Sequence, residues 1–223
     1  MGVYMMVDSV NERLNRVDEL LARYPDLSDS RLPISEAAEM MIRCATRGGI
    51  ILTCGNGGSS ADSGHIVGEL MKGFRRKRRI SDGLASTLVS LDSTYGSLLA
   101  GSLQQPIAAI DLTAHAPLVT AFVNDQSADA VFAQQVLGYS NRENLLVCIS
   151  TSGSSKNVIL AAFTARSLGL STIALTGKNG GELAKWCDVT ISVPGEETAA
   201  IQELHLPVYH ALCSIVEDHF FTE

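Results

Sequence analysis

The stretch Ile51–Glu69, ILTCGNGGSSADSGHIVGE, decides how the rest of the chain is interpreted. It opens on an apolar run, 49–54, that is long enough for one buried strand. A turn with three glycines in four positions follows, Gly55-Asn56-Gly57-Gly58, where the backbone can take unusual conformations and a ligand can approach closely. Serines 59 and 60 then precede a helical pattern. A strand, a glycine turn and a helix N-terminus together predict an anion site, because unpaired N–H groups and the helix dipole point at one spot.

The helix after this turn carries two residues with acid–base chemistry. His65 and Glu69 are four positions apart and therefore share a helix face, so a polar ligand bound at the turn would lie near both. The simpler alternative is that a glycine-rich turn only connects a strand to a helix. The pattern is neither the dinucleotide fingerprint nor a P-loop, because it lacks the third glycine and the Gly-Lys-Ser/Thr that those motifs require.

A second strand, loop and helix repeat this arrangement later in the chain. The apolar run 145–149 predicts a strand, Ser150-Thr151-Ser152-Gly153-Ser154-Ser155 follows it directly, and 157–168 has helical periodicity. Five hydroxyl residues at a strand end and a helix N-terminus can surround a phosphate with neutral donors. Serine-rich turns are common, and an ordinary turn is the alternative.

The remaining segments predict an α/β protein. Runs 106–111, 171–176 and 189–193 are further strands, and helical patterns lie between them, which implies parallel pairing through right-handed crossovers. In such sheets ligands bind beyond the carboxyl ends of the strands, where both loops fall. The segment 198–221 is helical by period, and Gln202 and His210 lie on roughly the same side of it. Pro207 between them is expected to kink that helix or mark its true start.

The N-terminal region and the basic run are the least determined parts. Segments 5–24 and 35–46 have amphipathic helical spacing, with a proline-bounded connector at 25–33. Arg75-Arg76-Lys77-Arg78-Arg79 is interpreted as a solvated loop, since like charges repel, with attraction of a phosphorylated ligand or another subunit as the alternative. The stretch 81–103 is rich in small residues and is expected to be helical.

Composition bounds the class of protein. At 223 residues, 46% hydrophobic and 18% charged, the chain fits one soluble α/β domain, or two small ones. A net charge of -7 argues against a general nucleic-acid binder. No apolar run reaches the roughly 18 residues of a membrane span and no signal peptide opens the chain, so a cytoplasmic protein is expected. The five scattered cysteines are typical of buried thiols in a reducing compartment.

Taken together, the 54–69 stretch, the 150–155 loop and Ile201-Gln202-Glu203-Leu204-His205 with His210 resemble the sugar isomerase (SIS) domain family. Within it they resemble the phosphoheptose isomerases, which convert sedoheptulose 7-phosphate to D-glycero-D-manno-heptose 7-phosphate for lipopolysaccharide core or related glycan biosynthesis. The resemblance implies a three-layer α-β-α sandwich with a five-stranded parallel sheet. It also implies a cytoplasmic homotetramer with active sites at subunit interfaces, held together in part by the N-terminal helix.

The resemblance also implies roles for individual residues. Glu69 would be the general base and His210 its partner acid, which fits the chemistry: moving a carbonyl from C2 to C1 through an enediol needs one group to take a proton and another to shuttle protons on the oxygens. Some family members bind zinc at positions matching His65, Glu69, Gln202 and His210, which makes zinc the implied metal. The residues implied to contact substrate are Asn56, Gly57, Gly58, Ser59, Asp125, Gln202, and, for the phosphate, Ser150, Thr151, Ser152 and Ser155.

The chain departs from the family pattern next to this site. A helical oligomerisation segment is expected at 1–34 and the SIS domain at 35–223, but 75–103 carries an insertion. Gly73 stands where the family commonly has an arginine, and Arg75 is the nearest substitute. Two alternatives stay open: a non-catalytic SIS protein, such as a sugar-phosphate sensor or a replication-initiator-associating protein, and an isomerase of another sugar phosphate.

Overall fold

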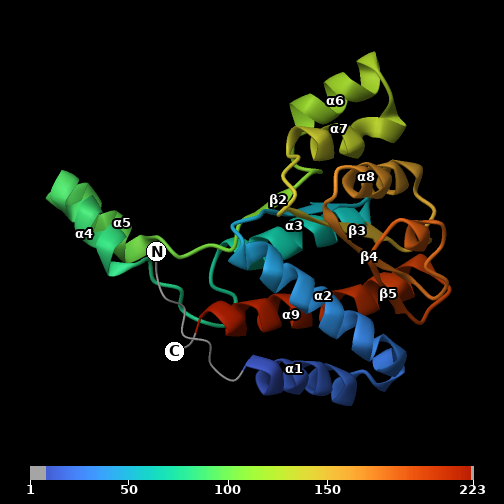
Figure 1. Ribbon diagram of the computed structural model, residues 1–223, viewed down its shortest axis with the longest axis horizontal. Helices are drawn as coiled ribbons and strands as arrows, with labels where there is room; N and C mark the ends of the chain where they lie inside the picture. Colours follow the sequence, from blue (N-terminus) through green and yellow to red (C-terminus); the bar gives the residue numbers. More distant parts are fainter. Residues whose placement is uncertain (1–8, 222–223) are drawn as a thin grey trace.

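A central parallel sheet carries the fold (Figure 1). The computed structural model describes residues 9–221, with side chains from residue 15. Within that range the sheet has five strands in the order β2-β1-β3-β4-β5, and every neighbouring pair is parallel. The strands are β1 (Ile51–Cys54), β2 (Ala109–Asp111), β3 (Leu145–Ser150), β4 (Ser171–Gly177) and β5 (Val189–Val193).

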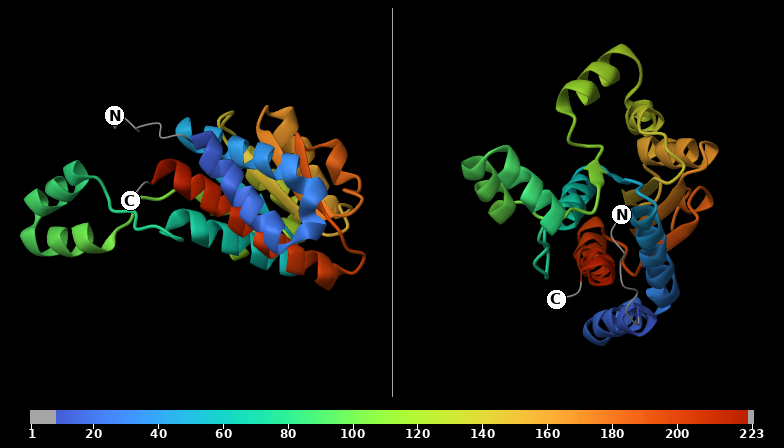
Figure 2. Two further views of the ribbon diagram at one scale, coloured as in Figure 1. Left: turned by 90° about the horizontal axis from the view of Figure 1, so that it is seen from below. Right: turned by 60° about the vertical axis from the view of Figure 1, so that its left-hand side comes forward.

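Helices cover both faces of the sheet and make three layers (Figures 1 and 2). One face packs against α2 (Arg31–Thr46), α3 (Gly58–Met71) and α9 (Thr198–Phe220), and α1 (Ser9–Arg23) lies outside them against α2 and α9. The other packs against α6 (Ala116–Asp125), α7 (Val131–Gly138) and α8 (Lys156–Ser167). Short 3-10 helices lie at Pro25–Ser30, Ala128–Ala130 and Leu183–Lys185.

The strands are apolar on both sides because each face builds its own core. In β3, Leu145 and Val147 contribute to the core under α9, whereas Leu146 and Cys148 contribute to the core under α8. This two-sided burial explains why the strands are continuous apolar runs rather than alternating patterns. All five cysteines are free and buried, as the sequence predicts.

The predicted fold is confirmed, with differences at helix boundaries. The second helix begins at Arg31 rather than Ser35, because Pro33 fits the first turn, where its missing N–H has no partner to lose. The last helix begins at Thr198 and continues through Pro207, so Pro207 does not mark its start. Burial of Val208 and its neighbours on α9 offsets the lost hydrogen bond. Positions 5–8 of the first predicted helix lie outside the described residues.

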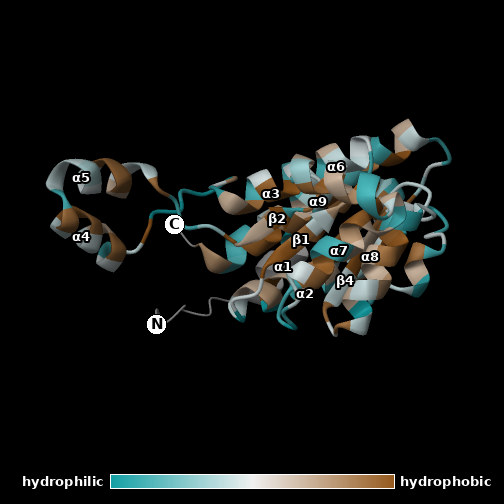
Figure 3. Ribbon diagram, turned by 90° about the horizontal axis from the view of Figure 1, so that it is seen from above, coloured by the Kyte–Doolittle hydropathy of each residue, from teal (hydrophilic) through white to brown (hydrophobic). Residues whose placement is uncertain are grey.

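The insertion forms a hairpin of two helices that projects from the body (Figures 1 and 3). It consists of α4 (Asp82–Leu91) and α5 (Ser93–Ser102), which contact each other. Its stem closes where Arg79 and Gln104 form an antiparallel bridge and the Gln105 N–H donates to the Arg78 carbonyl at 2.7 Å. Of the helices in residues 9–221, none combines the length and apolarity needed to cross a membrane.

Candidate functional site

The two predicted ligand loops meet at the carboxyl edge of the sheet. Asn56, after β1, and Asn157, at the start of α8, hydrogen-bond reciprocally through their side-chain amides at 2.9 Å. Gly57 has a φ of +56°, a conformation that favours glycine and that turns the chain into α3. At Gly58 a Cβ would lie 2.3 Å from the side-chain amide nitrogen of Gln202, so the two residues are in close contact and a larger residue at 58 would displace the Gln202 side chain.

The serine loop, 150–155, packs closely against the turn at Gly180 and leaves some of its hydroxyl groups accessible. Gly153 has a φ of +61°, and a Cβ there would lie 2.1 Å from the Gly180 carbonyl oxygen. The Ser150 hydroxyl donates to Ser155 at 3.1 Å, and Ser152 is exposed. Ser155 stands at the N-cap of α8 without bonding the helix through its side chain, which leaves the first N–H groups and the rim hydroxyls for an anion.

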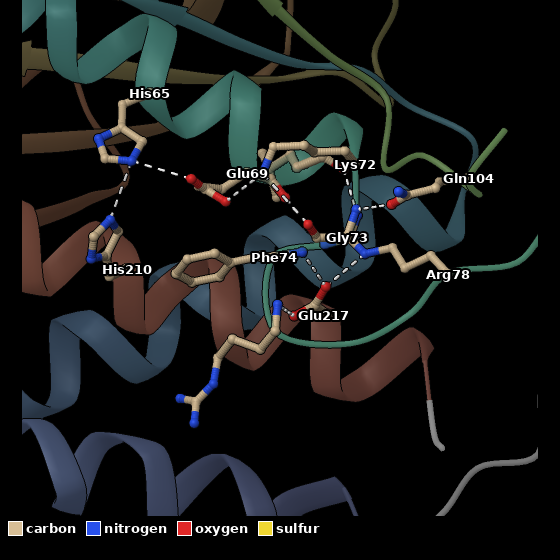
Figure 4. A network of polar contacts seen from close by, with 11 residues as sticks. His65, Glu69, Lys72, Gly73, Phe74, Arg78, Gln104, His210 and Glu217 are labelled. Carbon is tan, nitrogen blue, oxygen red and sulfur yellow. Dashed lines mark hydrogen bonds and ion pairs between the residues drawn. The ribbon is translucent and has the colours of Figure 1, made fainter. Parts of the chain in front are cut away.

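A second polar group forms where α3 and α9 run side by side in the same direction. Gly58 lies against Gln202, and His65 lies against His210 about two turns further on. His65 is the hub, because its Nε2 is 3.2 Å from Glu69 Oε1 and 3.4 Å from His210 Nε2 (Figure 4). The structure therefore brings together the predicted base, the predicted acid and a third residue with chemistry of its own.

Sequence reasoning missed two residues that hold this hub in place. The Tyr209 hydroxyl lies 3.0 Å from His65 Nδ1 and 3.3 Å from Asp62 Oδ1. Burial raises the pKa of Asp62, against the lowering effects of its Tyr209 hydrogen bond and of His65. The Tyr209 hydroxyl donates to Asp62 Oδ1, and its contact with His65 Nδ1 holds the imidazole ring in place. Helical spacing could have suggested Asp62, three positions before His65, but nothing local could have identified Tyr209.

The surroundings partly exclude solvent from the acid–base group, which consists of His65, Glu69 and His210. The Glu69 side chain is 13% exposed, and Lys72 Nζ lies 3.2 Å from its Oε2. The pKa of His210 is lowered, first by burial and then by the nearby His65, although Glu69 acts in the opposite direction. His210 is therefore neutral at neutral pH and can both accept and return a proton.

His210 also faces a cleft of about 710 Å³ between α1, α9 and the turn after α3. Phe74 and Arg75 line the same cleft, as do Arg16 and Arg23 of α1. The Phe74 and His210 rings lie 5.3 Å apart, centroid to centroid. Arg75 thus lines the same cleft as the candidate acid, two residues after Gly73.

The interpretation of the basic run as a solvated loop is wrong for two of its residues. Arg78 is buried, its Nε donates to Glu217 Oε1 at 2.8 Å, and both side chains are fully excluded from solvent. Glu217 also accepts from the backbone N–H groups of Phe74 and Arg75 at 2.8 and 2.7 Å (Figure 4). Arg76 pairs with Asp218. Acidic residues of α9 neutralise this part of the run, whereas Arg75, Lys77 and Arg79 are exposed.

Other predicted contacts lie apart from the acid–base group. Asp125 ends α6 on the surface, where Asn124 donates to its carboxylate at 2.8 Å. Gln202 precedes His210 by eight residues, about 12 Å along the helix axis. From Gly58 to Glu69 the rise of α3 is about 16 Å. Within one chain the glycine and serine loops are thus well separated from Glu69 and His210.

The implied zinc ligands fit in part. Bonds of about 2.0–2.1 Å in a tetrahedral site place ligand atoms roughly 3.3 Å apart. The distances from His65 Nε2 to Glu69 and to His210 are close to that value. Tyr209 occupies the other His65 nitrogen, as an outer partner of a metal ligand does. Even so, residues 9–221 contain no preformed group of three or more His, Cys, Asp or Glu able to hold a metal, and Gln202 lies two turns away.

Comparisons with known proteins agree on one family. Residues 98–214 match the SIS domain family, and residues 14–101 match a second SIS domain profile. The chain is 37% identical over 213 residues to a phosphoheptose isomerase of Dechloromonas aromatica, covering 94% of this chain and 90% of that protein. Among solved structures, a phosphoheptose isomerase of Neisseria gonorrhoeae superposes with a TM-score of 0.68 at 33% identity, covering 93% and 94% of the chains. That of Francisella tularensis gives 0.69 at 28% identity, covering 90% and 97%.

Proposed function

Because this chain belongs to the SIS domain family and, within it, to the phosphoheptose isomerases, we propose that it converts sedoheptulose 7-phosphate to D-glycero-D-manno-heptose 7-phosphate. The observation that carries the chemistry is the convergence of Glu69 and His210 on His65. A sensor of sugar phosphates needs a phosphate loop, but it has no need of a carboxylate and an imidazole that both contact His65.

The acid–base group suits an aldose–ketose isomerisation. Glu69 removes a proton from C1 of the ketose, and the electron pair forms the C1–C2 double bond of an enediol. His210 moves protons on the O1 and O2 oxygens, which its neutral state permits. Glu69 then returns the proton at C2. Each positioned proton transfer accounts for about 10²–10⁴-fold in rate.

The phosphate end of the substrate is assigned to the serine loop. Thr151, Ser152 and Ser155 supply hydroxyl donors at the rim, and the free N–H groups at the start of α8 add the helix dipole. Asn56 and Gln202, at the adjoining glycine loop, are placed to bond sugar hydroxyls. This arrangement binds a dianion without a lysine in the loop.

Distances within one chain favour a site shared between subunits. From carbonyl to phosphate, a seven-carbon sugar phosphate spans on the order of 10 Å, as five C–C bonds of about 1.5 Å and an ester imply. The helix α3 alone separates the glycine loop from Glu69 by about 16 Å. We therefore propose a homotetramer in which the loops of one subunit face Glu69 and His210 of another.

Zinc is proposed as the metal, held by His65, Glu69 and His210. Gln202, the implied fourth ligand, lies about 12 Å from His210 along α9 and does not complete this group within one chain. When bound it would act as a Lewis acid on the substrate carbonyl. In this chain Tyr209 orients His65 for that role, and Lys72 limits the freedom of Glu69. We also propose that the enzyme works in the cytoplasm, since its five free buried thiols suit a reducing compartment.

The test is turnover of sedoheptulose 7-phosphate followed by ¹³C NMR, beside a panel of other ketose and aldose phosphates. We expect an aldose 7-phosphate to form, and Glu69→Gln to stop its formation. Conversion of a different sugar phosphate with higher kcat/KM would change the substrate and keep the reaction class. Binding of the sugar phosphates without any conversion would replace the proposal with a non-catalytic sensor.

A further inference from the structure

The α4–α5 hairpin exposes apolar side chains that the rest of the chain leaves uncovered. Between residues 82 and 102 only Gly96 is buried, and neither helix belongs to the two cores. Figure 3 shows apolar segments of the hairpin standing clear of the body. Its seven exposed large apolar residues are 38–79% accessible: Leu84, Val89, Leu91, Tyr95, Leu98, Leu99 and Leu103.

Such a hairpin needs a partner to be stable. Each helix has ten residues, and helices shorter than about 12–15 residues are marginal in water without packing. Contact between α4 and α5 is close at Gly96, where a Cβ would lie 2.2 Å from the Leu88 carbonyl oxygen, but it covers one side only. Monomers rarely expose contiguous apolar patches above a few hundred Å². Seven large side chains supply a sizeable part of the ~800 Å² per partner that a standard interface buries.

Charge indicates which partner fits. The only charged residues in 81–103 are Asp82 and Asp92, and Asp92 caps α5 at the tip by accepting from the Thr94 and Tyr95 N–H groups. At the base, Lys77 and Arg79 are exposed, and no acidic side chain among the described residues pairs with them. Asp82 also lies at the base, where Lys77 and Arg79 outnumber it, so two hairpins packed tip to base would set Asp92 of each near the net positive base of the other.

We infer that the hairpin is a self-association arm. It packs against the same hairpin of a second copy, and the four helices form an antiparallel arrangement. A two-fold axis makes such a patch self-complementary, so one surface serves both copies. Because the acidic tips meet basic bases, the charges set the antiparallel direction, and the leucines supply the buried area. The surface is separate from the acid–base group, so the inference does not depend on the proposed function.

The first test measures mass in solution by light scattering and sedimentation on the full chain. Leu91 and Leu98 are 79% and 65% exposed, so the double variant Leu91→Glu/Leu98→Glu removes no internal packing. We expect its particle to contain half as many chains as the wild-type particle. The matched control is Leu118→Glu/Leu137→Glu, at exposed leucines of α6 and α7, which should keep the wild-type mass. A hairpin variant of wild-type mass would overturn the inference.

The second test uses disulfide cross-linking to determine whether the two hairpins pack antiparallel. The native thiols are buried and therefore do not interfere. Leu98→Cys, near the middle of α5, should link to its own copy under mild oxidation. Ser93→Cys, at the tip, should not, because antiparallel packing carries the two tips apart. Equal capture at both positions would overturn the antiparallel arrangement. Sedimentation of the wild type with zwitterionic or anionic phospholipid vesicles, lost in the double glutamate variant, would instead identify a membrane as the occupant.

Discussion

His65 joins the two candidate catalytic residues, Glu69 and His210. Its Nε2 faces both Glu69 and His210, and its Nδ1 faces Tyr209. The helical spacing of His65 and Glu69 was enough to predict one side of this group. The other side required knowing that α9 packs along α3, because His210 is 145 positions away in the chain.

Glu69→Gln should reduce turnover of sedoheptulose 7-phosphate by at least about 10²-fold, because the amide keeps the size of the side chain and loses its basicity. Binding of the sugar phosphate, measured by calorimetry, should change little, since the serine loop is intact. Glu36→Gln, at an exposed carboxylate of α2, is the control and should keep full activity. Wild-type turnover in the Glu69 variant would remove it as the base.

The buried His205 makes folding stability depend on pH. Burial lowers its pKa to about 4 from an ordinary 6.5, against a small raising effect of the Thr176 backbone. Below pH 6.5 the unfolded chain therefore binds a proton that the folded chain does not, so stability falls as pH drops from 6.5 towards 4, by up to about 3 kcal/mol. Urea unfolding of His205→Leu should show a flatter pH dependence across this window, whereas His115→Gln should retain the wild-type slope.

Contacts at both ends of α3 fix its position along α9. Gly58 and Gln202 fix one end, and Arg78 fixes the other, because its guanidinium donates to the Glu69 and Leu70 carbonyls at the end of α3 and pairs with Glu217 of α9. A cation at a helix C-terminus is favourable, and here it also anchors the turn that carries Arg75. The basic run predicted neither contact, since the pattern of like charges says nothing about acids 139 positions away.

Glu217→Gln should destabilise the fold by about 3–5 kcal/mol, because it leaves the Arg78 charge buried without a counter-charge. Urea unfolding measures this effect. Glu203→Gln, an exposed position on the same helix, is the control and should change stability by less than about 0.5 kcal/mol. The double variant Arg78→Met/Glu217→Met should recover part of the loss. A single variant as stable as the wild type would show that the pair does not anchor the turn.

The sheet was predictable from the sequence, whereas the packing of the helices against one another was not. Four of the five strands were predicted within two residues of their ends, since buried parallel strands are short apolar runs between turns. The fifth, β2, is shorter than predicted, 109–111 rather than 106–111. The parallel pairing of α3 and α9 and the projection of 82–102 depend on tertiary contacts that no local period encodes.

If subunits share the site, two inactive variants should restore activity when mixed. Glu69→Gln lacks the base, and Ser150→Ala/Ser155→Ala lacks hydroxyls of the serine loop, so a mixed oligomer contains some sites with both. Co-refolded samples should turn over sedoheptulose 7-phosphate well above the sum of the separate variants. Rates no higher than that sum would mean that each chain carries a complete site.

The closed stem of the hairpin has a consequence for how this chain can be altered. Because Arg79 and Gln104 lie side by side, the polypeptide leaves the body and returns to it at one point. Everything between can be shortened, lengthened or replaced by an unrelated module while the path of the remaining backbone stays the same. A lineage could therefore gain or lose this arm in a single step, and an engineer could graft a tag or a reporter there.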